Sequence, residues 1–414
     1  MSRIHTNVAV IGAGIIGTTI AERLQHEGQT VTLIDRQAPG EGCSKGNAGH
    51  FASDIIMPMA NFGTLLKVPK LLLNPQGPLT IRKAYFWQVL PWLLRFGMAA
   101  LPYKSRTSIS ALKSLNRPSI ARFKKLLERT QLQQLMTQRG ALTIYRSQSA
   151  AKENLRHSKF LRQHEVDVEV LDAAQVHDLE PALLEHIQGG LYFPNTAHSV
   201  NPHRLVTELA QHFLSQQGQF IQSELKQLRT CNEQVELELD QQTIIADQVV
   251  IAAGAWSHLI AKQLGHNVPL EAERGYHLML PNPKVTLTRP ITSYEDSFVM
   301  TPMENGLRLA GTAEFAGLDA EPNYHRAQIL LSHASKLLAN LNAQNSSQWM
   351  GCRPSLPDSL PVIDRSTKMK QVCFAFGHQH LGLTQAAVTA DLITEMILQR
   401  PYSQDIKAFR IDRF

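Results

Sequence analysis

The fold is decided by residues 8–17, VAVIGAGIIG, read together with Asp35 further along the chain. An apolar run of strand length leads into the pattern Gly-x-Gly-x-x-Gly. An amphipathic segment from Thr18 to Gly28 then connects it to a second apolar run at residues 31–34, which Asp35 closes. This order predicts a strand, a tight turn, a helix and a second strand, which is the opening unit of a dinucleotide-binding fold.

Each glycine of the pattern has its own physical task. Gly12 permits the turn, Gly14 lets the backbone approach a pyrophosphate, and Gly17 lets the helix pack on the strand. The phosphates would lie at the helix N-terminus, at the amides of Ile15 and Ile16, where the helix dipole favours negative charge.

Asp35 stands eighteen residues after Gly17, at the end of the second strand. A carboxylate there accepts hydrogen bonds from both hydroxyls of an adenosine ribose, and it would repel the 2′-phosphate of NADP. We therefore predict a dinucleotide site that includes Asp35 and its neighbour Arg36. A glycine turn with a purely structural role is the alternative.

Composition limits the classes of protein to consider. The chain has 414 residues, enough for two or three globular units, and its 43% hydrophobic and 18% charged residues exclude disorder as the main state. The formal net charge of +6 is compatible with carboxylate substrates, with anionic lipid or with no particular partner. Because the sequence lacks an arginine-rich stretch with interleaved aromatic residues, we expect no nucleic-acid partner.

The four cysteines are scattered and lack Cys-x-x-Cys spacing: Cys43, Cys231, Cys352 and Cys373. We therefore expect neither a metal site nor a disulfide scaffold. The first strand begins within a few residues of Met1 and is needed for the fold, so we expect no signal peptide and a cytoplasmic location.

Residues 42–50, GCSKGNAGH, form a loop of small residues. Ala48 and Gly49 let the backbone lie close to a flat ligand, while Ser44 and Asn47 offer hydrogen bonds. His50 is either an ordinary loop histidine or a side chain that faces this ligand.

The segment from Tyr85 to Leu101 is strongly apolar but is interrupted by polar residues and a proline, so it is too short and too broken to span a bilayer. Four basic residues flank it: Arg82, Lys83, Lys104 and Arg106. One interpretation is a helix pair packed on the protein's own core. The other is an apolar and basic face on a membrane surface, which predicts peripheral contact with the inner face of the cytoplasmic membrane.

Hydrophobic periodicity predicts that the chain leaves the dinucleotide-binding unit twice and returns twice. Helical patterns fill residues 62–135, and strands are expected at 140–145, 189–194, 220–228, 235–239, 246–252, 274–280, 297–302 and 306–315, with helices at 150–164, 202–216 and 326–341. The predicted domain segments are 1–60, 198–270 and 345–414 for the binding domain, and 61–197 and 271–344 for the second domain.

Three later motifs extend the opening pattern. Residues 252–256, AAGAW, end a buried strand in small residues, which lets the chain turn beside the dinucleotide. Residues 351–358 contain Gly-x-Arg-Pro and then Pro-Asp, and residues 377–382, GHQHLG, lead into the last predicted helix.

In order and spacing, these motifs resemble the FAD-dependent D-amino-acid dehydrogenase and glycine oxidase group of the D-amino-acid oxidase superfamily, over essentially the whole chain. The resemblance implies an α/β fold (α+β overall). Its parts would be a Rossmann-like FAD-binding domain of the glutathione-reductase-like type and a second domain built on a mostly antiparallel sheet. The loop at residues 42–50 would then pass along the pyrophosphate and the flavin.

The resemblance also implies roles for individual residues. In the group, the arginine of Gly-x-Arg-Pro binds the substrate carboxylate in a two-pronged ion pair, here Arg353, and a planar guanidinium suits this task. Tyr276 and His277 would line the substrate pocket, with ordinary sheet packing as the alternative, and His50 would face the flavin. Further implied FAD contacts are Leu225, Ala253, Gly254, Trp256, Gly351, His380, Leu381, Gly382, Leu383 and Thr384.

The implied reaction is the oxidative deamination of a D-amino acid. The carboxylate binds Arg353, a hydride passes from the alpha carbon to flavin N5, and water releases a 2-oxo acid and ammonia. Electrons would pass to a quinone or another acceptor, although an oxidase stays open. Two further functions also stay open: a dehydrogenase of a cyclic secondary amine such as D-proline or hydroxy-D-proline, and a non-catalytic flavoprotein subunit.

Some relatives attach FAD covalently through a cysteine near Gly-x-Arg-Pro. The register of Cys352 is one position off, so we expect non-covalent FAD.

Overall fold

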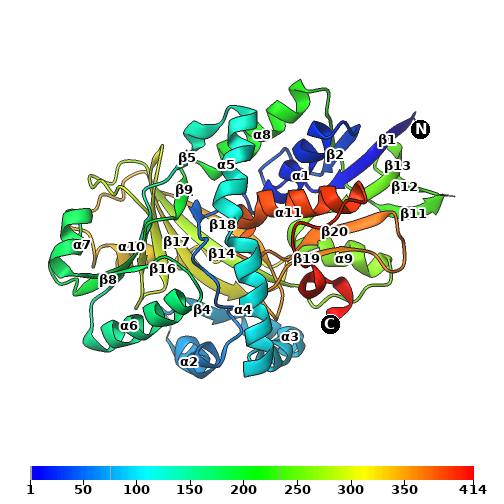
Figure 1. Cartoon of the computed structure of the whole chain (residues 1–414). Helices are drawn as coiled ribbons and strands as arrows, with labels where there is room; N and C mark the ends of the chain where they lie inside the picture. The colour runs from blue at the N-terminus through cyan, green and yellow to red at the C-terminus, as the bar shows by residue number, and fades with distance from the viewer. Residues whose placement is uncertain (1, 75, 232) are drawn as a thin grey trace.

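The first large sheet is built around the opening motif (Figure 1). The computed structural model describes residues 2–74, 76–231 and 233–414. Strand β1 (Ser2–Ile11) lies between β2 (Val31–Asp35) and β13 (Gln242–Ile251), and both pairings are parallel. Such strands are buried on both faces, which accounts for their continuous apolar runs. The sheet is completed by β10 (Gln219–Gln222), β11 (Gln227–Cys231), β12 (Gln234–Glu238), β19 (Val362–Arg365) and β20 (Val372–Phe376).

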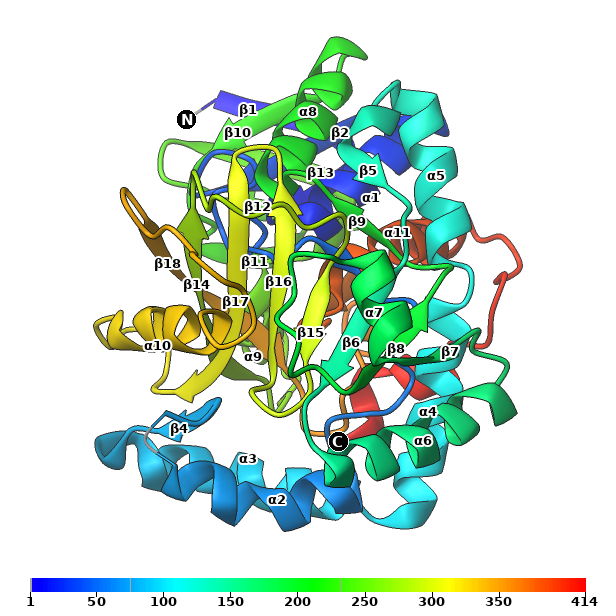
Figure 2. The ribbon, with the colours of Figure 1, turned by 90° about the vertical axis from the view of Figure 1, so that its left-hand side faces the viewer.

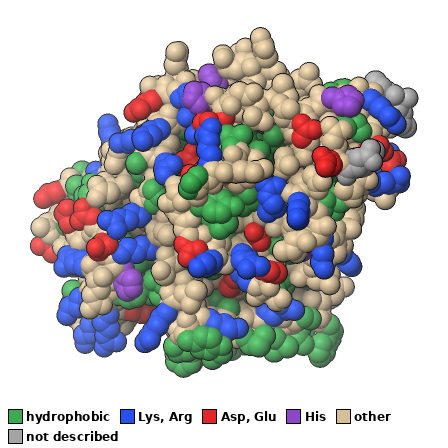
Figure 3. Space-filling model, turned by 45° about the vertical axis from the view of Figure 1, so that its right-hand side comes forward, with side chains coloured by type: hydrophobic (Ala, Val, Ile, Leu, Met, Phe, Trp, Pro, Cys, Tyr) green, Lys and Arg blue, Asp and Glu red, His purple; other side chains and the backbone are tan. Residues whose placement is uncertain are grey.

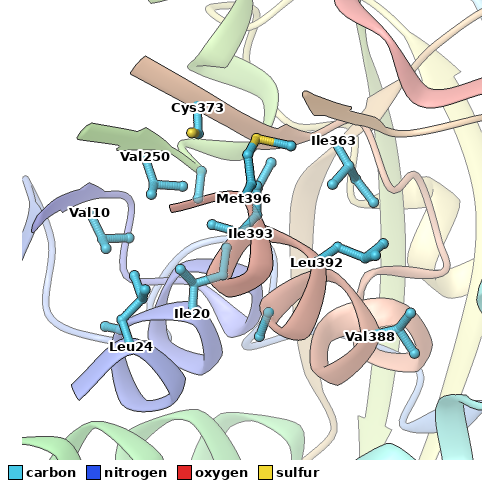
Figure 4. Close-up of a cluster of buried hydrophobic side chains, with 14 of the residues drawn as sticks. Val10, Ile20, Leu24, Val250, Ile363, Cys373, Val388, Leu392, Ile393 and Met396 are labelled. Atoms are coloured by element: carbon cyan, nitrogen blue, oxygen red, sulfur yellow. The ribbon is translucent and has the colours of Figure 1, made fainter. Parts of the chain in front are cut away.

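Two helices cover one face of this sheet. Helix α1 (Ile15–His26) follows the glycine turn, and α11 (Gly382–Ile397) packs against it. Val10 of β1, Ile20 of α1 and Ile393 of α11 are fully buried in one hydrophobic cluster (Figure 4). Because β1 and β20 run in the same direction, the two helices that follow them begin at the same edge of the sheet.

The second large sheet is mostly antiparallel, as predicted. Its order is β18-β14-β17-β16-β15-β6-β8-β7, with β4 beside β17, and the parallel pairs within the described residues are β15 with β6 and β17 with β4. The bounds are β4 (Leu79–Ile81), β6 (Ala141–Tyr145), β7 (Glu169–Asp172), β8 (Gly189–Phe193), β14 (Glu271–Leu280), β15 (Ile291–Ser293), β16 (Phe298–Met303), β17 (Gly306–Phe315) and β18 (Ser347–Ser355).

A small third sheet joins β3 (His50–Phe51), β9 (Ala197–Ser199) and β5 (Met136–Thr137). Figure 2 shows α2 and α3 side by side beneath the lower end of the second sheet. The remaining helices are α2 (Phe62–Leu73), α3 (Phe86–Ala99), α4 (Pro102–Asn116), α5 (Ser119–Thr130), α6 (Gln148–Gln163), α7 (Ala173–Leu179), α8 (Pro202–Ser215), α9 (Ser257–Gln263) and α10 (His325–Ala334), with short 3-10 turns at 83–85, 133–135, 254–256, 407–409 and 411–413.

Two predicted elements differ from the structure. The strand expected at 220–228 is two strands with different partners, because the Ser223 amide donates to the carbonyl of Asp35 and the chain then turns to pair with β12. The helix expected at 326–341 ends at Ala334. Beyond it the chain tightens, and Leu338 forms a β-bridge with Leu183 instead.

The division into five domain segments remains a prediction. Strand β18 lies within the segment 345–414 that was assigned to the binding domain, yet it pairs with β14 in the second sheet. The strand that carries Gly-x-Arg-Pro therefore belongs to the second sheet.

Candidate active site

The glycine turn leaves no room for side chains. Gly12 has a φ of +108°, and a Cβ there would lie 2.4 Å from the carbonyl oxygen of Ala252. A Cβ on Gly17 would lie 1.8 Å from the carbonyl oxygen of Gly12. Gly14 is more open, with Ser44 Oγ as its nearest neighbour at 3.2 Å. The turn therefore has the close backbone packing that a nucleotide cradle needs.

The loop at residues 42–50 reaches the start of α1. The first amides of a helix lack partners within the helix. The amide of Ile15 donates to Ser44 Oγ at 2.9 Å, and the amide of Ile16 remains for a ligand. The structure thus brings together three of the residues predicted for the pyrophosphate.

Asp35 lies beside this turn at the end of β2. Its Oδ2 accepts a hydrogen bond from the amide of Ala13 at 2.7 Å, and its Oδ1 accepts one from the amide of Gln37 at 2.9 Å. Both bonds fix the carboxylate in place. The next residue, Arg36, stacks its guanidinium over the ring of Trp256 at 4.2 Å, which joins two predicted cofactor residues from distant motifs.

The small residues after β13 complete this part of the site. A Cβ on Gly12 would lie 2.9 Å from the Cα of Ala253, and Gly254 has a φ of +54°. Side chains are thus kept away from the turn on this side as well.

The rest of the small-residue loop is held by backbone contacts. Asn47 Oδ1 accepts from the amide of Gly49 at 2.8 Å, and the carbonyl of Gly49 accepts from the amide of Ser199 at 2.7 Å. Arg308 on β17 donates to the carbonyl of Asn47 at 2.5 Å, with half-buried Ala48 next to it. The loop therefore joins the start of α1 to the third sheet and to β17 of the second sheet.

The N-terminus of α11 has no side-chain cap, so its first amides are open to a ligand. One amide predicted to contact the flavin is already paired: the Leu381 amide donates to the carbonyl of His378 at 2.8 Å. The amides of Gly382, Leu383 and Thr384 remain as candidates. The hydroxyl of Thr384 points elsewhere, since it accepts from the amide of Ala52 at 3.0 Å.

Arg353 lies where β18 passes β14. Its Nη1 is 2.7 Å from Glu273 Oε1 and donates to the carbonyl of Thr312 at 3.3 Å. The guanidinium lies over Gly275, where a Cβ would be 2.3 Å from Nη2. Glu273 also accepts from Ser355 Oγ at 2.8 Å. The arginine is thus held in one orientation, and Gly275 provides the space for it.

His277 and Tyr276 do not line one pocket, because neighbouring residues of a strand point to opposite faces. His277 Nδ1 is 3.1 Å from the carbonyl of Gly46, and the ring stacks on Trp349 at 5.2 Å. Burial lowers the pKa of His277 to about 3, so the ring is neutral and Nδ1 is the donor. Tyr276 is fully buried on the other face, where its hydroxyl donates to Glu314. The pocket role predicted for Tyr276 therefore lacks structural support.

His50 lies on β3, close enough to His380 for the two rings to interact electrostatically. Burial lowers the pKa of each to about 4, so both rings are neutral near pH 7. His50 Nε2 is 3.9 Å from Asp54 Oδ1, and neither atom has a hydrogen-bond partner among the described residues.

Leu225 follows β10 rather than lying in a strand, and it is half-buried against the cluster on the far face of the first sheet. Gly351 lies beneath the Trp349 ring, since a Cβ there would be 2.0 Å from it. Cys352 points away from Arg353 into a hydrophobic cluster, and burial raises the pKa of its thiol. This placement agrees with non-covalent FAD, which stays a prediction.

Sequence reasoning missed Glu273, Trp349 and Asp54. Glu273 and Trp349 were detectable in principle, because period-two alternation along β14 and β18 puts them on the same faces as His277 and Arg353. In the described ranges, no group of three or more His, Cys, Asp or Glu side chains is arranged to hold a metal ion.

A glycine turn, a carboxylate fixed beside it and an oriented arginine on a second sheet are the features expected of a flavoprotein oxidoreductase. The chain belongs to the DAO family of FAD-dependent oxidoreductases, whose family model matches residues 7–396. FAD is therefore its cofactor, and the resemblance predicted from the motifs is confirmed.

Relatives cover the chain from end to end. It is 32% identical to a D-amino-acid oxidase from Bradyrhizobium diazoefficiens, over 99% of both chains. It is 30% identical to a D-amino acid dehydrogenase from Dechloromonas aromatica, over 95% of this chain and 97% of that one.

Solved structures confirm the predicted fold. A glycine oxidase from Geobacillus kaustophilus aligns with a TM-score of 0.79 at 19% identity, over 99% of both chains. An L-proline dehydrogenase from P. horikoshii aligns with a TM-score of 0.78 at 17% identity, over 100% of this chain and 98% of that one.

Proposed function

We propose that this enzyme oxidatively deaminates D-amino acids to 2-oxo acids and ammonia. When bound, FAD would supply the acceptor for the hydride of the substrate's alpha carbon. The observation that carries the proposal is the position of Arg353: Glu273 holds it within electrostatic range of Cys43 in the small-residue loop, and its hydrogen bonds to described residues use Nη1, which leaves its other nitrogens for a ligand.

The residues present fit FAD at three points. The glycine turn excludes side chains around Gly12 and Gly17. Asp35 is fixed where a ribose diol would bind. The uncapped amides at the start of α11 can hold negative charge at the pyrimidine end of the flavin.

The protein's own residues orient the substrate. Arg353 would bind the carboxylate through two parallel hydrogen bonds, which would fix both the position and the orientation of the amino acid. His277, neutral and donating through Nδ1 to Gly46, keeps Nε2 as an acceptor and holds the loop against β14. Neutral His50 and His380 add no positive charge that would repel a cationic substrate amine.

Anaerobic mixing of the purified holoenzyme with a panel of D-amino acids tests the reaction. We expect bleaching of the flavin absorbance by D-amino acids and not by their L-enantiomers. The panel includes D-proline and hydroxy-D-proline, so preferential reduction by these would favour a cyclic-amine dehydrogenase. A holoenzyme that no substrate reduces would favour a non-catalytic flavoprotein subunit.

We further propose that electrons leave to a quinone or another acceptor at the inner face of the cytoplasmic membrane. None of the helices that the structure describes is long and apolar enough to cross a bilayer. Comparing turnover with oxygen and with a short-chain quinone tests the choice of acceptor. Faster turnover with oxygen would overturn the quinone proposal.

A further inference from the structure

The exposed apolar residues of this protein are concentrated in one region. Of the eighteen large hydrophobic side chains that are exposed in the described chain, twelve lie between residues 59 and 103. They are Met59, Phe62, Leu65, Leu66, Leu72, Leu73, Phe86, Trp87, Leu94, Met98, Leu101 and Tyr103. Figure 3 shows hydrophobic side chains gathered along the lower edge of the molecule, where α2 and α3 lie in Figure 1. Scattered exposed hydrophobics are ordinary, but a contiguous group marks an interaction surface.

The two helices of this region bury little of their apolar surface. Helix α2 has no buried residue, although most of its side chains are apolar. Helix α3 buries three: Val89, Trp92 and Ala99. The most exposed of the large side chains are Leu73 at 84% and Trp87 at 77%. A short helix gains most of its stability by packing its apolar face against another surface. The apolar side chains of α2 therefore indicate a packing partner that is absent from the described chain.

The charge of this region is of one sign. Residues 55–127 contain no Asp or Glu and twelve Lys or Arg. Five of these bases pair with carboxylates from outside the stretch: Lys67, Arg82, Lys113, Arg117 and Arg122. Around α2 and α3, five others form no ion pair with any residue the structure describes: Lys70, Lys83, Arg95, Lys104 and Arg106. The partner of this surface must therefore be apolar and negatively charged.

A second copy of the chain does not meet this requirement. A two-fold symmetric contact would place the same patch on both sides, so the unpaired bases would face each other with no carboxylate between them. An anionic bilayer does meet it, because its interior takes the apolar side chains while its headgroups pair with the bases.

We propose that α2 and α3 form one docking face that rests on an anionic lipid surface, with Trp87 and the neighbouring exposed side chains in the headgroup region. The face includes α2 as well as the Tyr85–Leu101 segment. This proposal specifies which surface makes the membrane contact given under the proposed function, and it does not depend on the reaction.

The docking face lies directly against the strand that carries the substrate arginine. Trp92 of α3 donates from Nε1 to the carbonyl of Ser355 at 3.3 Å. Ser355 donates to Glu273, which holds Arg353. Docking would therefore turn this edge of the second sheet toward the bilayer, where a lipid-soluble acceptor is concentrated.

Flotation of the holoenzyme with vesicles tests the docking face. We expect it to float with phosphatidylcholine vesicles that contain phosphatidylglycerol at about 0.1 M salt, and much less at about 1 M, where the screening length falls from about 10 Å to about 3 Å. Vesicles of phosphatidylcholine alone should bind less. If the protein stays at the bottom of the gradient with anionic vesicles at low salt, the proposal is wrong.

Two exposed positions give matched variants. Trp87→Glu on α3 should lower the bound fraction about tenfold or more, because it removes a large apolar contact and adds a charge of the wrong sign. Leu214→Glu changes an exposed side chain on α8, away from the face, and should float like wild type. Equal flotation of Trp87→Glu and wild type would overturn the assignment. It would also be overturned if sedimentation showed that wild type and Leu214→Glu are dimers and Trp87→Glu is a monomer.

Failure of this proposal can be told apart from failure of the proposed function. Both variants should still bleach their flavin with a D-amino acid in vesicle-free solution, because Trp87 and Leu214 lie outside the candidate active site. Flotation without flavin reduction would leave the docking face intact and reject the reaction.

Discussion

Glu273 Oε1 and Arg353 Nη1 are 2.7 Å apart, on directly opposite positions of the neighbouring strands β14 and β18. The pair is partly buried, so the arginine is oriented before any substrate arrives, but one of its nitrogens is already engaged. A substrate carboxylate must therefore share the guanidinium with Glu273, which gives two separate predictions.

Arg353→Ala should leave FAD bound and lower kcat/KM for a D-amino acid by roughly 100-fold, about 3 kcal/mol, mainly through KM. The kcat/KM of Arg353→Lys should lie between those of wild type and Arg353→Ala, since lysine keeps the charge but not the planar guanidinium. Steady-state kinetics, with the flavin spectrum as a check on cofactor content, measure both. Arg229→Ala, at an exposed position of β11, is the control. A KM unchanged in Arg353→Ala would refute the assigned role.

Glu273→Gln should tighten binding of simple carboxylates. Removing the competing negative charge leaves Arg353 uncompensated, so the inhibition constant of acetate should fall roughly 3- to 10-fold, about 1 kcal/mol. Competitive inhibition assays measure this. A weaker affinity for acetate in the variant would mean that Glu273 supports the anion site rather than competing with it.

Asp35→Ala should weaken FAD binding by roughly 10- to 100-fold, because the ribose loses a charged acceptor and the Ala13 amide loses its partner. Quenching of flavin fluorescence on titrating the apoprotein gives the affinity. Asp405→Ala, an exposed position near the C-terminus, should bind FAD like wild type. If the Asp35 variant is purified as yellow as wild type and holds FAD equally well, the ribose contact lies elsewhere.

Gly17→Ala should destabilise the fold by more than about 3 kcal/mol, since its methyl group would overlap the carbonyl of Gly12. Gly97→Ala on α3 has no neighbour within 4 Å of the new methyl group and should stabilise by about 0.5–1 kcal/mol. Thermal unfolding of the two variants compares them. Similar melting temperatures would contradict the close packing of the turn.

Asp54 should make stability depend on pH. Burial raises its pKa from 3.8 to about 6. Between pH 3.8 and about 6, the folded protein therefore keeps a proton that the unfolded chain has released. The contribution of Asp54 to the free energy of unfolding is fully present below pH 3.8, and it is lost as the pH rises through 6. Asp54→Asn should be as stable as wild type near pH 4 and more stable near pH 8 by on the order of 2–3 kcal/mol.

Denaturant unfolding at the two pH values measures the effect. Asp54 and Asp167 both line a cavity of about 240 Å³, and Asp167 is exposed, so Asp167→Asn is the control for amide substitution in this region. A difference between Asp54→Asn and wild type that is the same at both pH values would show that Asp54 does not titrate as described.

The parts of this structure that the sequence predicted are those with local physical signals. The turn from Gly12 to Gly17, Asp35 and the end of β13 depend on residue types at fixed spacing, and the structure joins them through Ala252 and Trp256. The small-residue loop and α11 were likewise recognisable.

The parts that were missed depend on which strands become neighbours. Glu273 and Arg353 are far apart in the sequence, and only the pairing of β14 with β18 brings them together. The pocket role predicted for Tyr276 is not supported, since its hydroxyl donates to Glu314 on the other face of the strand. The sequence alone does not show which face of a strand will meet the pocket. Asp54 lies outside every motif, and its environment is created by tertiary packing alone.

The position of β1 has a consequence for how the protein is made. This strand is synthesised before its neighbour β13, which ends at Ile251, and before β20, which extends the sheet and ends at Phe376. The nascent chain must therefore keep one side of this apolar strand unpaired until β13 has been synthesised, and α11 follows only after β20. Such long-range pairing is slow and prone to aggregation, so this enzyme should depend on chaperones during synthesis and acquire its flavin only after release.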